Sequence, residues 1–169
     1  MRALVEQTAN YEVVLVASNK PDALGLEWAI EHDVATWAHD SRGFEREDYD
    51  RILSAALEEH EVGTIALAGF MRILSAWFVQ RWAGRILNIH PSLLPKYRGL
   101  DTHARAIEAG DRVSGCSVHI VTEELDAGEV LGQAEVEIQP EDSPATLEQR
   151  VLTAEHRLYP QVLNQFVMR

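Results

Sequence analysis

Short apolar runs separated by amphipathic stretches organise the first half of the chain. The runs predict strands, because they are rich in Val, Ile, Leu and Ala and are flanked by turn residues or by helical patterns. They lie at 12–18, 34–37, 64–68 and 85–89. Helices are predicted from Pro21 or Asp22 to about 31, over 46–59, and from a cap at Ser75 to about 82. This alternation predicts an α/β fold with a mostly parallel sheet and right-handed crossovers.

The second half has a different order of elements. Residues 91–101 hold two prolines and Gly99, which predicts a loop, and 102–109 predict a short helix capped by Asp101 or Thr102. The runs 117–121 and 129–138 flank a turn at 126–128 and are expected to pair antiparallel. A closing helix is expected over about 147–166 despite Pro160. Because no repeat or linker interrupts the chain, we expect a single domain over 1–169.

Composition and charge narrow the possible partners. The 169 residues are 46% hydrophobic and 25% charged, as in an ordinary globular domain. A formal net charge of −12 and the lack of a Lys/Arg cluster speak against nucleic acid, so a small-molecule substrate is expected. No apolar run approaches the ~20 residues of a membrane span, and no signal peptide is recognisable, so the default expectation is a cytoplasmic protein that does not bind membranes.

Asn88 and His90 are the first candidates for chemistry. They are two residues apart on one strand, so they share a face, and Pro91 ends that strand. Ligands bind at the carboxyl ends of strands in open α/β sheets. An amide can donate to a developing oxyanion, and an imidazole can move a proton near neutral pH. The pair predicts chemistry at a carbonyl carbon, although a lone histidine is more often a satisfied core residue.

Asp126 is the second candidate, in the turn that precedes Gly128. An Asp with a Gly nearby is also typical of a plain turn. If the turn folds over His90, its carboxylate would favour the imidazolium and raise its pKa. The two side chains would then form an acid/base pair suited to a proton shuttle.

The remaining polar candidates are weaker. His103 is expected to be exposed in the first turn of a helix, and His119 to be structural within a strand. Ser92 lacks the GxSxG context of a serine nucleophile. The single cysteine, Cys116, excludes an internal disulfide, and the seven histidines lack metal-binding spacing, so no metal is expected.

Residues 69–74 (GFMRIL) follow the third predicted strand and carry several apolar side chains. One interpretation is that Phe70, Ile73 and Leu74 pack in the core. The other is that the segment forms a slot for a flat heterocycle whose edge meets backbone groups.

These motifs resemble a known family. Residues 88–95 (NIHPSLLP) resemble the signature of the formyl-tetrahydrofolate-dependent formyltransferases, and three further segments support the likeness: 69–75 (GFMRILS), 96–99 (KYRG) and 124–128 (ELDAG). Within the family, 102–103 (TH), 117–119 (SVH) and 155–156 (EH) resemble the branch that formylates glycinamide ribonucleotide in purine biosynthesis. The likeness extends from about residue 13 to 159, with its motifs in the same order.

The resemblance implies a Rossmann-like fold and transfer of a formyl group from 10-formyltetrahydrofolate, a co-substrate, to the amine of glycinamide ribonucleotide, without a metal. Asn88 would stabilise the oxyanion of the tetrahedral intermediate, His90 would be the general acid/base, and Asp126 would tune His90 and order a water. The residues implied to contact the folate are Arg46, Met71, Arg72, Ile73, Leu74, Asn88 and Val121. Those implied to contact the other substrate are Gly69, Pro91 and Glu155, with Glu155 at the ribose hydroxyls.

One departure from the family pattern concerns the start of the chain. Family members begin with a strand and a Gly-rich loop that holds the substrate phosphate, whereas residues 1–5 here predict the helix that follows that loop. We therefore expect the first strand and the phosphate loop to be missing, through a shortened N-terminus. Such a loss would leave two strand edges unpaired.

Several alternatives remain open from the sequence. The chain could be a formyltetrahydrofolate hydrolase or a methionyl-tRNA formyltransferase, although its net charge speaks against tRNA. It could also be a catalytically impaired remnant that still binds folate. A homodimer is possible, because unpaired strand edges favour self-association.

Overall fold

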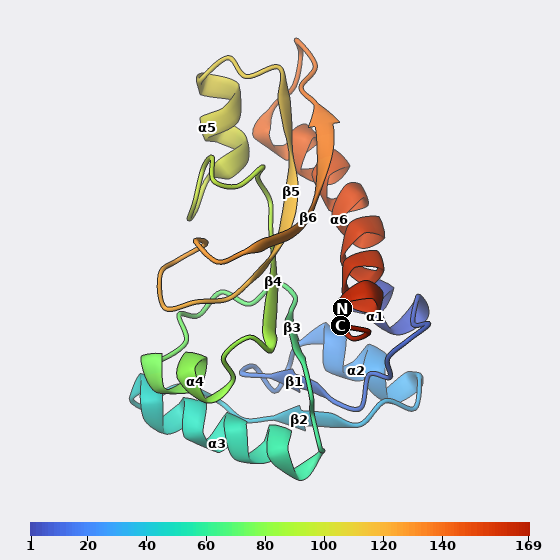
Figure 1. Ribbon diagram of the computed structural model, residues 1–169, viewed down its shortest axis with the longest axis vertical. Helices are drawn as coiled ribbons and strands as arrows, with labels where there is room; N and C mark the ends of the chain where they lie inside the picture. Colours follow the sequence, from blue (N-terminus) through green and yellow to red (C-terminus); the bar gives the residue numbers. More distant parts are fainter.

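Six strands and six helices form the protein, and the computed structural model describes all of residues 1–169 (Figure 1). The strands are β1 (Val16–Ser18), β2 (Thr36–Ala38), β3 (Ile65–Leu67), β4 (Ile86–His90), β5 (Val113–Ile120) and β6 (Val130–Glu137). The helices are α1 (Arg2–Glu6), α2 (Leu24–Glu31), α3 (Arg46–Glu59), α4 (Ala76–Arg81), α5 (Thr102–Glu108) and α6 (Pro144–Phe166).

The strands form two sheets. β1 and β2 pair in parallel as a two-stranded sheet, and the other strands form a four-stranded sheet in the order β3-β4-β5-β6. β3 and β4 are parallel, whereas β4, β5 and β6 are antiparallel neighbours. The predicted α/β class, with a parallel portion followed by an antiparallel C-terminal portion, is confirmed.

Local chemistry sets the helix boundaries. Ser75 caps α4 by accepting a hydrogen bond from the Phe78 N–H, as predicted. α6 begins three residues before its predicted start, because Ser143 and Thr146 form a capping box there. α3 has the predicted limits of 46 and 59.

β5 begins four residues earlier than predicted. Its early part contains Gly115, whose missing side chain obscured the strand pattern. A Cβ at this position would lie 2.0 Å from the carbonyl oxygen of Ala134 on β6, so only glycine allows the two strands to approach.

The four-stranded sheet is packed on both faces. Leu87 of β4 and Val118 of β5 pack against Tyr159 and Leu163 of α6, which runs along the sheet in Figure 1. The next residue back along β4, Ile86, faces the opposite side and packs against α3 and α4. Because side chains alternate along a strand, Asn88 and His90 share the face of Ile86.

The two sheets leave an apolar cavity between them. β1 pairs only with β2, and β3 only with β4, so each has an edge without a strand partner. Both strands line a cavity of about 610 Å³, together with residues from α1, α3 and α6. The expectation of two unpaired strand edges therefore agrees with the structure, while the expected shortening of the N-terminus stays a prediction.

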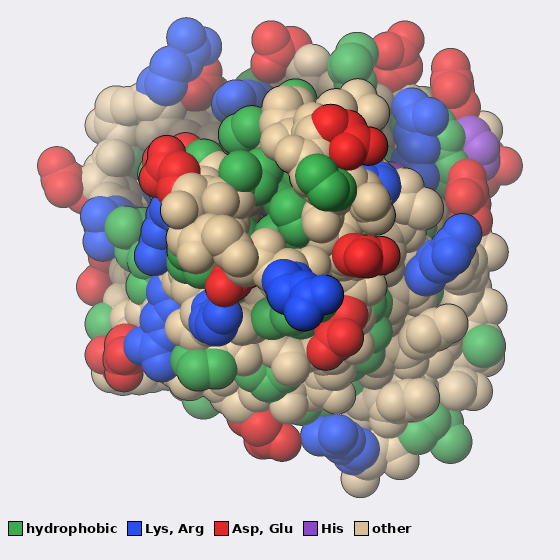
Figure 2. Space-filling model, turned by 90° about the horizontal axis from the view of Figure 1, so that it is seen from above, with side chains coloured by type: hydrophobic (Ala, Val, Ile, Leu, Met, Phe, Trp, Pro, Cys, Tyr) green, Lys and Arg blue, Asp and Glu red, His purple; other side chains and the backbone are tan.

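The surface carries mixed charge. On the face shown in Figure 2, Lys and Arg side chains are interleaved with Asp and Glu rather than gathered into a cationic patch. None of the helices is both long enough and apolar enough to cross a membrane. No group of three or more His, Cys, Asp or Glu side chains is placed to hold a metal ion.

Candidate active site

The centre of the site lies at the end of β4. In the antiparallel pairing with β5, Asn88 stands opposite His119 and His90 opposite Ser117. Residues directly opposite one another lie on the same face of a sheet, so His119 joins the face of Asn88 and His90. The predicted placement of the amide and the imidazole side by side is borne out by this geometry.

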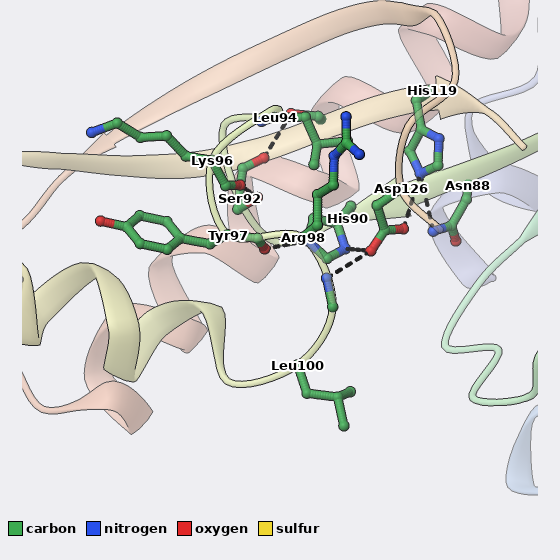
Figure 3. A network of polar contacts seen from close by, with 12 residues as sticks. Asn88, His90, Ser92, Leu94, Lys96, Tyr97, Arg98, Leu100, His119 and Asp126 are labelled. Atoms are coloured by element: carbon green, nitrogen blue, oxygen red, sulfur yellow. Dashed lines mark hydrogen bonds and ion pairs between the residues drawn. The ribbon is translucent and has the colours of Figure 1, made fainter. Parts of the chain in front are cut away.

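Both ring nitrogens of His90 face acceptors (Figure 3). Nε2 donates to the carbonyl oxygen of Tyr97 at 2.9 Å, and Nδ1 lies 3.3 Å from Oδ2 of Asp126. The two paired side chains are each only 7% exposed. Each ring nitrogen of His90 therefore lies next to an oxygen of the protein.

Asp126 is held by a strained turn. Its φ of 49° lies in the left-handed region, and Oδ2 also accepts a hydrogen bond from the Gly99 N–H at 2.9 Å. A Cβ at Gly128 would lie 1.8 Å from the carbonyl oxygen of Ile120, so the turn can approach β5 only with glycine there. The turn thus folds over His90, as the functional interpretation required.

Opposing effects set the pKa of Asp126. Burial disfavours the carboxylate, but the nearby His119, the hydrogen bond from the Gly99 amide and the nearby His90 outweigh it. The pKa of Asp126 consequently lies below its ordinary value. The carboxylate is therefore charged at neutral pH and can pair with a protonated His90.

His119 takes a larger part in the site than its sequence position suggested. Its Nδ1 donates to the Ile120 carbonyl at 2.9 Å, and its Nε2 lies 3.3 Å from Asn88 Nδ2 and 3.5 Å from Asp126 Oδ1. The ring is 2% exposed and joins the amide to the carboxylate. The sequence signal that could have found it is its position directly opposite Asn88 once β4 and β5 are paired.

A buried polar network shapes the loop after β4. The Ser117 hydroxyl donates to the Ser92 carbonyl at 2.6 Å and accepts from the Leu94 N–H at 3.0 Å. Gln133 of β6 donates to both the Ser117 hydroxyl and the Leu94 carbonyl at 2.9 Å. Ser92 is therefore part of the scaffold, in line with the rejection of a serine nucleophile.

The residues implied to bind folate lie on several elements. Met71 and Ile73 are large apolar side chains that are 80% and 61% exposed in the loop between β3 and α4. Leu74 and Val121 pack against the buried cluster around Tyr49, and the guanidinium of Arg72 lies 4.4 Å from the centre of the Tyr49 ring. Arg46 is the exposed first residue of α3. The core interpretation holds for Leu74 but is wrong for Ile73, which is exposed, and the slot for a flat heterocycle stays a prediction.

The residues implied to bind the second substrate are not all brought together. Gly69 and Pro91 follow the carboxyl ends of the parallel neighbours β3 and β4, so they lie at one edge of the sheet. Glu155 lies on α6, and its neighbouring charges are Glu148 and the amino group of Met1. Burial first, and then Glu148, raise the pKa of Glu155 to about 7.

Comparisons with known proteins match nearly the whole chain. The sequence profile of the family described as "Formyl transferase" matches residues 1–163. Phosphoribosylglycinamide formyltransferase of Escherichia coli (strain K12) is 51% identical over 152 residues, which are 89% of this chain and 72% of that protein. The trifunctional purine biosynthetic protein adenosine-3 of Drosophila melanogaster is 45% identical over 174 residues, covering 99% of this chain and 13% of that protein. The chain thus spans only a small part of this trifunctional relative.

Solved structures share the fold. The crystal structure of phosphoribosylglycinamide formyltransferase from Brucella melitensis superposes with a TM-score of 0.92 at 44% identity. The match covers 98% of this chain and 88% of that one. The enzyme of the same name from Bacillus halodurans also gives a TM-score of 0.92, at 33% identity.

Proposed function

The chain belongs to the formyl transferase family, and from this premise we propose that it transfers a formyl group from 10-formyltetrahydrofolate to the amine of glycinamide ribonucleotide. The family that the sequence motifs resembled is thereby confirmed. The observation that carries the proposal is the convergence of Asn88, His90 and Asp126 at the carboxyl end of β4.

The reaction moves an acyl group between two nitrogens. The acceptor amine forms a bond to the formyl carbon, whose oxygen takes up negative charge in a tetrahedral intermediate. The bond from this carbon to the folate nitrogen then breaks, the amine loses a proton, and the folate nitrogen gains one. Such a site needs an oxyanion donor, a proton carrier and aligned substrates, and it needs no covalent nucleophile.

Asn88 is suited to stabilise the oxyanion. One N–H of its amide faces Nε2 of His119 at 3.3 Å, which fixes the orientation of the group. The second N–H remains available to a substrate oxygen. A donor fixed before the reaction need not reorganise as the charge develops, which is the main source of such stabilisation.

His90 and Asp126 are suited to carry the proton. Because Nε2 is engaged by the Tyr97 carbonyl, the proton exchanged with the substrates is carried on Nδ1, next to Asp126. A water ordered by Asp126 can bridge the ring to the reacting nitrogens. His90 thus serves as acid and base in turn.

The folate co-substrate fits the loop between β3 and α4. Met71 and Ile73 present apolar surface there, and a flat heterocycle can bury it. Arg72 in the loop and Arg46 at the start of α3 carry positive charge, which suits the carboxylates of a folate. The residues assigned to this contact are the set already implied from the sequence.

The proposal is favoured over the other formyl-folate reactions. Curated relatives and solved structures similar to the chain include proteins named phosphoribosylglycinamide formyltransferase and trifunctional purine biosynthetic proteins. The net charge of −12 also opposes binding to tRNA.

A direct assay of the acceptor tests the proposal. The protein is incubated with 10-formyltetrahydrofolate and one of three acceptors: glycinamide ribonucleotide, methionyl-tRNA or water alone. We expect formylated glycinamide ribonucleotide, and tetrahydrofolate release that depends on that acceptor. Formate release at the same rate without an acceptor would indicate a hydrolase instead. Folate binding with no turnover on any acceptor would indicate an impaired remnant.

A further inference from the structure

The loop between β3 and α4 is held by very few polar contacts. Residues 69–74 take part in no backbone–backbone hydrogen bond, and none of their side chains forms one. The most exposed of these residues, Met71 and Ile73, are the apolar side chains assigned to folate. Something outside the loop must therefore keep its shape.

Asp50 of α3 fixes the end of this loop. Its side chain is fully buried, and Oδ2 accepts a hydrogen bond of 2.6 Å from the backbone N–H of Ser75. The hydroxyl of Ser75 in turn accepts from the Phe78 N–H and caps α4. The carboxylate thus holds the residue at which the loop ends and the helix begins.

The preceding residue of α3 holds the middle of the loop. The ring of Tyr49 is 1% exposed and lies under the guanidinium of Arg72, with 4.4 Å between the ring centre and Cζ. Its hydroxyl donates to the His39 carbonyl at 3.1 Å, which ties the ring to the end of β2. Two consecutive residues of one helix therefore anchor the loop at two points.

The carboxylate of Asp50 is costly where it lies. Oδ1 has no hydrogen-bond partner although it is buried, and Nε of Arg72 is also buried without one. A buried polar side chain with an unpaired atom opposes folding. The presence of Asp50 at this position is therefore better explained by the groups that it positions than by a gain in stability.

We propose that Asp50 is a positioning residue for the folate-binding loop: its hydrogen bond to the Ser75 N–H holds Met71 and Ile73 where the co-substrate meets them. It contacts no substrate and acts through the backbone. The inference rests on the proposed function, because it takes residues 71–74 as part of the folate site.

Three variants test it. Asp50→Ala removes the acceptor, Asp50→Asn keeps an acceptor oxygen of the same shape, and Ser54→Ala is the matched control. Ser54 is also buried, one turn further along α3, but it contacts Trp82 and Glu58 instead of the loop. All three are first checked for folding by circular dichroism, and their kinetics are then measured with each substrate varied in turn.

For Asp50→Ala we expect an about tenfold rise in KM for 10-formyltetrahydrofolate, since a misplacement of about 1 Å can cost up to ~100-fold at a positioned group. We expect kcat and the KM for glycinamide ribonucleotide to stay within about twofold of the wild-type values, because Asn88, His90 and Asp126 are not displaced. Asp50→Asn and Ser54→Ala should keep the wild-type KM. Hydrogen exchange of the Ser75 amide should quicken in Asp50→Ala alone, because its N–H loses its acceptor.

Two results would overturn the proposal. One is an unchanged KM for 10-formyltetrahydrofolate in Asp50→Ala, and the other is a rise of this KM in Asp50→Asn equal to the rise in Asp50→Ala. If the wild-type protein transfers no formyl group, the proposed function fails separately. The role of Asp50 is then decided by folate affinity in titration calorimetry, where an about tenfold weaker binding by Asp50→Ala supports it and equal binding refutes it.

Discussion

The pairing of Asn88 with His119 across β4 and β5 determines how the amide is presented to a substrate. Asn88→Ala removes the oxyanion donor, and we expect kcat to fall by about 10²–10³, the usual cost of losing one such donor. Substrate affinity should change little, because the donor acts mainly in the transition state. Steady-state kinetics of the folded variant measure both effects. A raised KM with unchanged kcat would instead make Asn88 a binding residue.

Asp126 gives a prediction about stability and pH. Its pKa is lower in the folded protein than its ordinary value of about 3.9, so the folded state favours the carboxylate. Its contribution to stability is present above that ordinary value and is lost as the pH falls through the lowered pKa. Wild type should therefore be more stable than Asp126→Asn at pH 7, and the difference should vanish in strong acid. Urea unfolding from pH 2 to 7 measures this, and a difference independent of pH would refute it.

At the scale of single residues, the sequence predicts the roles that side chains carry better than the roles that backbone groups carry. The sequence predicted Asn88, His90 and Asp126 as one site, and the structure brings the three together. It did not predict Tyr97, because this residue acts through its carbonyl oxygen at a φ of 54°, which no residue identity announces. It did not predict Asp50 either, since its partner is a backbone amide 25 residues away.

Among the elements, α6 carries the clearest pH-sensitive group. Burial and Glu148 raise the pKa of Glu155 to about 7, so the folded state favours its protonated form. The resulting stability is fully present below the ordinary pKa of about 4.3 and is lost as the pH rises through 7. Relative to Glu155→Gln, wild type should lose up to ~3 kcal/mol between pH 4 and 8, at ~1.4 kcal/mol per pKa unit. Thermal unfolding of both proteins across this range measures it, and parallel stability curves would contradict it.

Elements with their own local signals were predicted best. α3 has a strong helical period and α4 a serine cap, and both were located closely. β1 covers only Val16–Ser18 of the predicted 12–18, because a strand is defined by its partner and β1 is paired on one side alone. Pairing of this kind depends on residues far away in the sequence, which a local pattern does not contain.

At the scale of the whole molecule, the open edges of β1 and β3 lead to a prediction about association. Unpaired edges beside apolar surface favour pairing with another copy of the chain. We expect light scattering to show an average mass that rises with concentration. Val14→Lys, next to the edge of β1, should reduce this rise, because an edge lysine opposes pairing.

The matched control is Val113→Lys. Val113 is 37% exposed, against 38% for Val14, but it lies at the start of β5, where it pairs with Glu137 of β6, and not beside the open edge of β1 or β3. The Val113→Lys variant should associate to the same extent as wild type. A monomer at every concentration would contradict the prediction.

The strands form two separate sheets. The sequence predicted the open strand edges between them only through its resemblance to the formyltransferase family. Apolar periodicity predicts strands and helices, but it does not say which strand edges stay open. The sequence contains no Lys/Arg cluster, and on the face shown in Figure 2 the Lys and Arg side chains are likewise interleaved with Asp and Glu.

The most direct test of the central claim compares kcat/KM for formyl transfer between wild type, His90→Ala and His60→Ala. His60 ends α3 and bonds only to the Ala56 carbonyl, so its variant controls for the loss of a histidine remote from the site. We expect His90→Ala to lose about 10²–10⁴ in rate, the usual contribution of a general acid/base, and His60→Ala to lose almost nothing. Full transfer by His90→Ala would contradict the account.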